Sequence, residues 1–225
     1  MNKMGIMSRQ ELTNAVQTAL RQWRQPAGVD PLAALTLNRQ LQQRSACTPQ
    51  QASQRLLVDA LEQLAGVNHE GALILRLHYF DDLKVHAIAR QLSLHEGTVN
   101  KKQREALEQL VDILFAQEEA AAVRMRQTAL ARLEPPTYLQ LFGLEANIDR
   151  LLRQVLTPGP PWLYAIEGIG GIGKTTLADG LLRRAIDITP WCEVAWVTAR
   201  QRVLNLGGYI DPLPTPALTA DALVD

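Results

Sequence analysis

Residues 83–99 read LKVHAIARQLSLHEGTV, which has the spacing of a helix-turn-helix. In this interpretation Ala89 lies where two helices cross closely, Ser93 occupies the turn, and Val99 packs from the second helix against the first. Glycine is the usual residue at such a turn, so Ser93 is a mild departure, and a positive φ there would have an energetic cost. The stretch predicts a short helix, a tight turn at Ser93 and a longer helix from Glu96.

Helical periodicity extends outward from this motif through the first two thirds of the chain. Apolar residues repeat at helical spacing over 8–23, and again over 69–80, where the Asp81-Asp82 pair ends the pattern. Thr48-Pro49 is typical of a helix start, with a hydroxyl at the cap and proline in the first turn. The helix that begins at Glu96 is expected to continue, or restart, to about residue 133.

Prolines divide the chain, because Glu134-Pro-Pro-Thr137 cannot continue a helix and favours an extended linker. The sequence therefore predicts a helical domain over 1–133, with the helix-turn-helix within about 69–115. After the linker over 134–137, a second domain is expected over 138–225.

The motif region resembles a known DNA-binding family. From 85 to 110 the sequence is similar to region 4 of bacterial sigma-70-type factors, and LILRLHYFD at 73–81 matches the helix before the motif. The resemblance implies transcription regulation, with duplex DNA or RNA polymerase as the partner. The side chains expected to face the major groove or its flanking phosphates are Glu96, Thr98, Asn100, Lys101, Lys102 and Arg104.

Charge supports this interpretation locally. The whole chain has 23 basic and 23 acidic residues, but the stretch from Lys84 to Arg104 has five basic residues and one acid. Acids follow directly at Glu105 and Glu108, so the basic footprint is small. A second interpretation stays open: the same three helices form a plain core that recruits a protein partner.

A second motif lies at 168–175, where GIGGIGKT fits the phosphate-loop pattern GxxxxGK[ST]. Glycines let successive backbone N–H groups point at an anion, and a lysine supplies a point charge to the β- and γ-phosphates. ATP or ADP with Mg²⁺ is the expected ligand, and the Thr175 hydroxyl is the expected magnesium contact. The expected cradle is Gly168, Gly170, Gly171, Ile172, Gly173, Lys174, Thr175 and Thr176.

The flanks of this loop predict a βαβ unit. Residues 162–166 and 193–198 have the composition of buried strands, and residues 174–186 between them have a helical pattern. The expected fold class is therefore a mainly α helix-turn-helix domain followed by an incomplete α/β P-loop NTPase domain with a parallel sheet.

Around the loop the sequence resembles the STAND-class NTPases, and within them the NB-ARC-like ATPases of signalling proteins. The matching residues are GIGGIGKTTLA at 168–178, VAWVT at 194–198 and LFGLE at 141–145, where Leu144 replaces the family's usual arginine. The resemblance covers about 138–205. It implies a nucleotide-switched regulator in which bound ADP holds a closed state, and exchange to ATP permits self-association.

A carboxylate suited to hydrolysis is missing from the pattern. The family places it at the end of an apolar strand, whereas Asp179 and Asp187 lie on the loop's helix, Asp211 lies in a Pro/Gly-rich stretch and Asp225 is the last residue. No segment matches the family's sensor arginine or helical lid. We therefore expect no catalytic residues and no nucleotide hydrolysis by this chain alone. The expectation is that the chain is the front part of a longer NTPase or a degenerate remnant of one.

The alternative hypothesis is a protein-interaction module of a signalling or defence NTPase, with a vestigial, non-hydrolysing loop. No apolar stretch is long enough for a membrane helix, and the N-terminus turns polar too early for a signal peptide. The sequence thus predicts a cytoplasmic protein without a membrane partner.

Overall fold

The computed structural model describes residues 7–24, 28–136, 138–189, 194–198, 202–204 and 209–212. The chain forms two compact units, of which the first comprises 1–127 with 185–192 and the second comprises 128–184 with 193–225. No helix in the described ranges has the length and apolar character that a membrane crossing requires.

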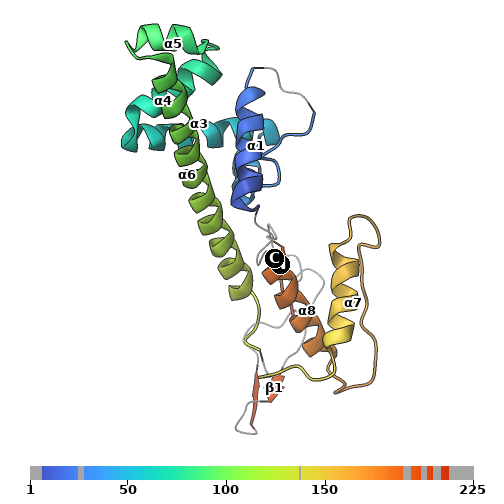
Figure 1. The fold of residues 1–225 in the computed structure, drawn as a ribbon. Helices are drawn as coiled ribbons and strands as arrows, with labels where there is room; N and C mark the ends of the chain where they lie inside the picture. The colour runs from blue at the N-terminus through green and yellow to red at the C-terminus, as the bar shows by residue number, and fades with distance from the viewer. Residues whose placement is uncertain are drawn as a thin grey trace. The chain divides into compact units, whose positions relative to one another are not determined.

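The first unit is helical, and its order of elements follows the sequence pattern (Figure 1). Ser8 and Glu11 form a capping box before the first helix, and Thr48 and Gln51 form another, with Pro49 in the first turn, which confirms the predicted start there. The elements are α1 (Arg9–Arg21), α2 (Thr36–Ser45), α3 (Pro49–Val67), α4 (His69–Leu75), the π-helical turn η1 (Arg76–Phe80), α5 (Val85–Gln91) and α6 (Glu96–Ala131).

The core of this unit lies where α1, α3 and α6 meet. Leucines and small residues from all three helices are buried there, including Leu12, Val16, Leu57, Leu64, Leu110 and Leu114. Burial of each such leucine or valine stabilises the fold by about 1.5–3 kcal/mol. At the surface of the same contact, Arg9 of α1 pairs with Asp112 of α6 at 2.7 Å.

Helix α2 is capped by a residue far away in the sequence. Its own N-cap residue, Leu35, has no side chain that can accept a hydrogen bond. Instead the carboxylate of Glu118 on α6 accepts from the backbone N–H of Thr36 at 2.7 Å and of Leu37 at 3.1 Å. Glu118 is only 3% exposed, so a buried anion holds the positive end of α2 against α6.

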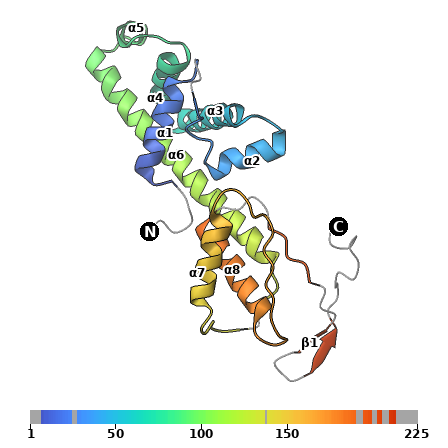
Figure 2. The ribbon, with the colours of Figure 1, turned by 90° about the vertical axis from the view of Figure 1, so that its right-hand side faces the viewer.

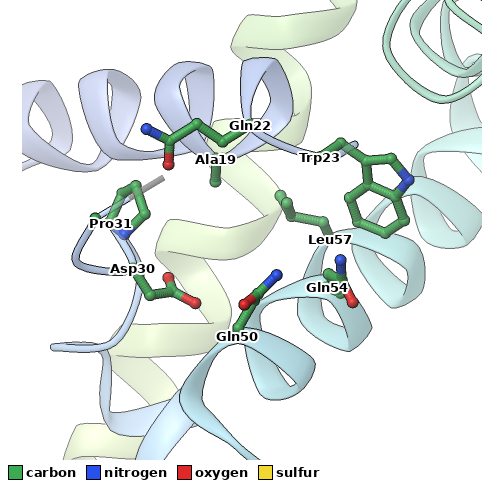
Figure 3. A pocket seen from close by; sticks show the side chains of 9 residues that line it. Ala19, Gln22, Trp23, Asp30, Pro31, Gln50, Gln54 and Leu57 are labelled. Atoms are coloured by element: carbon green, nitrogen blue, oxygen red, sulfur yellow. The ribbon is translucent and has the colours of Figure 1, made fainter. Parts of the chain in front are cut away.

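A chain of polar groups joins α2 to α3. The fully buried Asn38 donates from Nδ2 to the Pro49 carbonyl and to Ser53 Oγ, and Ser53 in turn donates to Asp30 Oδ1 at 2.8 Å. Figure 3 shows Asp30 at the rim of a small crevice of about 50 Å³, beside the amide of Gln50. The buried Asn38 and Ser53 thus both have partners, as burial requires, whereas the buried hydroxyl of Thr36 has none among the described residues.

The second unit contains α7 (Glu145–Leu156) and the phosphate-loop helix α8 (Lys174–Ile188), whose last turn belongs to the first unit. A Cβ on Gly180 would lie 2.8 Å from Leu141 Cδ1 and 3.2 Å from Ile148 Cδ1, so α8 approaches its neighbours closely at this glycine. Two short strands, β1 (Arg202–Leu204) and β2 (Ile210–Pro212), pair antiparallel.

The prediction of a parallel sheet, and with it of an incomplete α/β P-loop NTPase fold, is wrong for the described residues. Residues 162–166 form no strand, and Trp162 and Leu163 are 82% and 86% exposed rather than buried. Residues 194–198 form no strand either, while Glu193 and Asp225 lie outside the described ranges. The strand pair that does form, β1–β2, is antiparallel and lies outside the expected βαβ unit.

The physical reason is that apolar composition does not supply a strand partner. Two short parallel segments on either side of a helix form few hydrogen bonds and leave both edges and one face uncovered. The helix expected between them over 174–186 does form, as α8, because a helix satisfies its backbone groups internally.

Candidate nucleic-acid interface and phosphate loop

Three elements form the helix-turn-helix: α4 with its continuation η1, then α5, then the start of α6 (Figures 1 and 2). They share a small core of their own, separate from the core under α1 and α3. Its buried members are Ile74, Leu77, Ile88, Ala89 and Val99. The predicted packing positions of Ala89 and Val99 are confirmed, at 6% and 0% exposed.

The predicted tight turn lies between α5 and α6, and its backbone is strained at Ser93. Ser93 has a φ of +55°, and the backbone N–H of Leu94 closes the turn on the Ala89 carbonyl at 2.9 Å. His95 then caps α6, because its Nδ1 accepts from the backbone N–H of Gly97 at 3.3 Å. The turn therefore sets the angle at which α6 leaves α5.

Replacing Ser93 with glycine is expected to raise the free energy of unfolding by up to about 1 kcal/mol, because glycine adopts a positive φ without steric cost. Urea denaturation followed by circular dichroism measures the change. Ser93→Ala is the matched control, since it keeps the Cβ and should give no gain. A less stable glycine variant would contradict the strained turn.

The structure places most of the predicted DNA-facing residues on the outer surface of α6. Glu96, Asn100, Lys101 and Arg104 are exposed, and Thr98 is partly buried at the flank. Helical periodicity explains this, because Val99, Ala106 and Leu110 point into the core and Lys101 and Arg104 lie opposite them.

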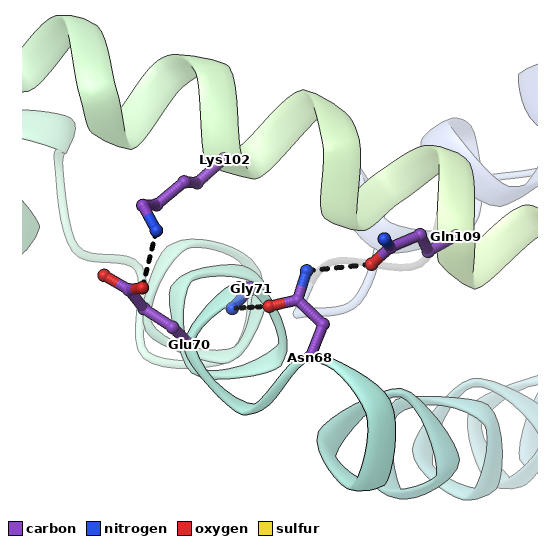
Figure 4. A network of polar contacts seen from close by, with 5 residues as sticks. All are labelled: Asn68, Glu70, Gly71, Lys102 and Gln109. Carbon is purple, nitrogen blue, oxygen red and sulfur yellow. Dashed lines mark hydrogen bonds and ion pairs between the residues drawn. The ribbon is translucent and has the colours of Figure 1, made fainter.

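Lys102 does not belong to this outer face. Its Nζ forms an ion pair with Glu70 in the first turn of α4 at 2.6 Å (Figure 4). Beside it, Asn68 caps α4 by accepting from the Gly71 N–H at 2.9 Å and donates to Gln109 Oε1 at 2.8 Å. Lys102 and Gln109 thus fasten α4 to α6. Sequence reasoning missed this role, although an acid in the first turn of the preceding helix was a signal for it.

Helices α4 and α6 lie close together because a glycine lies at their contact. A Cβ on Gly71 would lie 2.8 Å from Ala106 Cβ, so only glycine allows α4 to approach α6 this closely. Two further cations are exposed, Lys84 at the N-cap of α5 and Arg90 on α5. Lys101 forms an ion pair with Glu105 one turn along α6 at 3.8 Å, but both side chains are exposed, so the pair is weak and leaves the ammonium accessible.

The phosphate loop leads directly into α8. Gly171 and Gly173 have φ of +78° and +93°, a conformation that glycine adopts readily and other residues rarely do. Lys174 Nζ donates to the carbonyls of Gly168 and Ile169, both at 2.8 Å, so the loop wraps around the lysine. Of the other expected contacts, Gly170, Ile172 and Thr175 are exposed and Thr176 is partly buried.

A small cavity adjoins Thr175 and Thr176, and a polar network forms one of its walls. Asp179 Oδ2 accepts from Tyr138 Oη at 2.5 Å and from Arg183 Nε at 2.8 Å. Burial, followed by the hydrogen bond to the Asp179 carboxylate, raises the pKa of Tyr138 to about 12. The hydrogen bond to Asp179 also raises the pKa of Arg183.

This network indicates that Asp179 has a structural role. The carboxylate is 7% exposed and already has two donors, so it holds α8 to the segment around Tyr138 and is not available to a metal ion. Thr175 has an exposed side chain in the first turn of α8, and its contact with magnesium stays a prediction. The pairing of Asp179 with Arg183 at i,i+4 was visible in the sequence, but its tyrosine partner was not.

Comparison with known proteins identifies no relative. No protein-family model matches the chain, and neither a curated protein nor a solved structure matches it. Its function is therefore inferred from its own residues.

Proposed function

We propose that this chain is a DNA-binding transcription regulator of the cytoplasm whose helix α6 enters the major groove of duplex DNA. The observation that carries the proposal is the exposed face of α6, where Asn100, Lys101 and Arg104 lie together beyond a tight turn. An asparagine amide matches adenine, and an arginine matches guanine or a phosphate. The resemblance to sigma region 4 points to the same partner.

The test is binding of the full chain to a fluorescently labelled duplex, measured by anisotropy at two salt concentrations. Four exposed cations, Lys84, Arg90, Lys101 and Arg104, are available for phosphate contacts. If all four contribute, affinity should fall roughly 100-fold between about 50 mM and about 200 mM salt. No binding at the lower salt would leave the alternative, in which the same helices recruit a protein such as RNA polymerase.

A second function is supported by the geometry of the glycine loop. We infer that residues 168–176 bind the phosphates of ADP or ATP with Mg²⁺, which makes the regulator responsive to nucleotide. Positive φ at two glycines and the central position of Lys174 support phosphate binding. The proposal concerns the loop and α8 alone, and it includes no hydrolysis because the buried Asp179 is occupied. Self-association in the ATP state remains a proposal from the STAND resemblance.

Lys174→Ala is expected to weaken ADP binding about tenfold or more, because the charged donor to the phosphates is lost. Fluorescence of Trp196, which lines the cavity beside Thr175 and Thr176, and the thermal midpoint with ADP and Mg²⁺ are the two readouts. Lys84→Ala is the matched control, since it removes an equal charge from α5. An identical response of both variants to ADP would remove nucleotide from the proposed function and leave a vestigial loop.

A further inference from the structure

A cavity of about 300 Å³ lies in the first unit between α3 and the α4–η1 segment. This volume is at the lower end of the range for small-molecule sites. Its apolar lining is Val58, Leu61, Ala65, Ala72, Leu73 and Phe80. Of these, Leu61 and Ala72 are buried, and the others are partly open to the cavity.

One basic residue, one acidic residue and one histidine line the cavity. Arg76 and His69 line it from the α4–η1 side and Glu62 from α3, and all three side chains are exposed. The ion pairs between described residues of this unit engage Arg9, Arg24, Lys101, Lys102 and Arg126, so Arg76 keeps its donors for another acceptor. An apolar pocket beside an unengaged guanidinium suits a molecule with an apolar body and an anionic end.

The wall that carries Arg76 is also a wall of the helix-turn-helix. Ile74 and Leu77 of the same segment pack in the core with Ile88 and Val99. The segment changes from α- to π-helical geometry at Arg76, a local irregularity that frequently accompanies functional sites. At its end Phe80 stacks on Trp23, with the ring centroids 4.0 Å apart, which connects it to the end of α1.

We propose that this cavity binds a small apolar carboxylate, such as a medium-chain fatty acid, with the carboxylate on Arg76 and the chain over Leu61 and Leu73. A ligand bound in the cavity contacts the α4–η1 segment and thereby changes the affinity of α6 for DNA. This consequence rests on the proposed DNA binding. A carboxylate matches the planar guanidinium of Arg76, which can donate two parallel hydrogen bonds to it. A small molecule fits better than a partner helix, because a volume of about 300 Å³ is in the range of small-molecule sites.

The test uses the full chain and octanoate as the probe, with octylamine and 1-octanol as ligands of equal chain length. Calorimetry should show octanoate binding saturably at one site per chain. Arg76→Gln should weaken it about tenfold, while Glu62→Gln should strengthen it, because a like charge is removed. Neither substitution should change 1-octanol binding. Both side chains are exposed, and circular dichroism checks that both variants are folded.

Several results would overturn the proposal. Tighter binding of octylamine than of octanoate, weaker octanoate binding by Glu62→Gln, or no saturable octanoate binding would each show that the site does not take a carboxylate. Duplex affinity measured with and without saturating octanoate tests the regulatory consequence, and an unchanged affinity overturns it. A chain that binds octanoate but no duplex would instead contradict the proposed DNA binding and leave the ligand site standing.

Discussion

Reversing the charges of Lys101 and Arg104 together, to glutamate, is expected to lower the affinity for duplex DNA about 100-fold. Both side chains are exposed on the face of α6 opposite Val99, so their replacement leaves the core of the helix-turn-helix unchanged. The slope of log affinity against log salt should also become shallower by about two, because two phosphate-facing cations are lost. Anisotropy titrations over a salt series measure both quantities.

The matched control is Arg124→Glu, which reverses an exposed charge on the same helix but beyond the motif. It should leave duplex affinity nearly unchanged. Lys102→Gln should also have a small direct effect on affinity, since Lys102 is engaged with Glu70, and should lower stability by no more than about 1 kcal/mol. If Lys102 instead proved as important for DNA as Arg104, the assignment of the outer face of α6 would be wrong.

Replacing Glu118 with alanine is expected to destabilise the first unit by about 3 kcal/mol. The carboxylate accepts from the N–H groups of Thr36 and Leu37, and no other side chain caps this end of α2. Its removal leaves those donors without a partner and opens a gap between α2 and α6. Urea denaturation followed by circular dichroism at the helical band measures the loss.

Two further variants make this prediction specific. Glu119→Ala changes an exposed neighbour on the same helix and should have little effect. Glu118→Gln keeps the shape and one accepting oxygen but loses the charge, so it should cost about half as much as alanine. Equal stability of Glu118→Ala and Glu119→Ala would show that the capping bonds contribute nothing.

Short sequence patterns predicted many of the helices of the first unit. The capping residue Thr48, the crossing residue Ala89 and the turn residue Ser93 each act through their immediate neighbours in the chain, so a short stretch of sequence contains their information. The loop of glycines before Lys174 was predicted for the same reason, because positive φ is a property of single residues. The prediction of strands over 162–166 and 193–198 was wrong for the described residues, because a strand depends on a partner strand that a local pattern does not specify.

The same distinction holds for the candidate sites. Asn100, Lys101 and Arg104 were predicted from the resemblance to sigma region 4, and their exposure follows from helical spacing, which determines which side of a helix a residue occupies. The engagement of Lys102 by Glu70 depends on how two helices cross, as does the burial of Glu118 against α2. The cavity beside Arg76 likewise depends on tertiary structure, because residues of α3 and of the α4–η1 segment line it together.

By itself, then, the sequence determined where helices with local capping signals begin, which faces are apolar, and where glycine allows the backbone to turn, since each depends on a few consecutive residues. The start of α2, which Glu118 caps from α6, depends on tertiary structure instead. The tertiary structure alone decided which charged side chains are engaged within the fold and which are available to a ligand. The reason is that a charge is neutralised by whatever lies within a few ångströms of it, and those neighbours come from segments far apart in the chain.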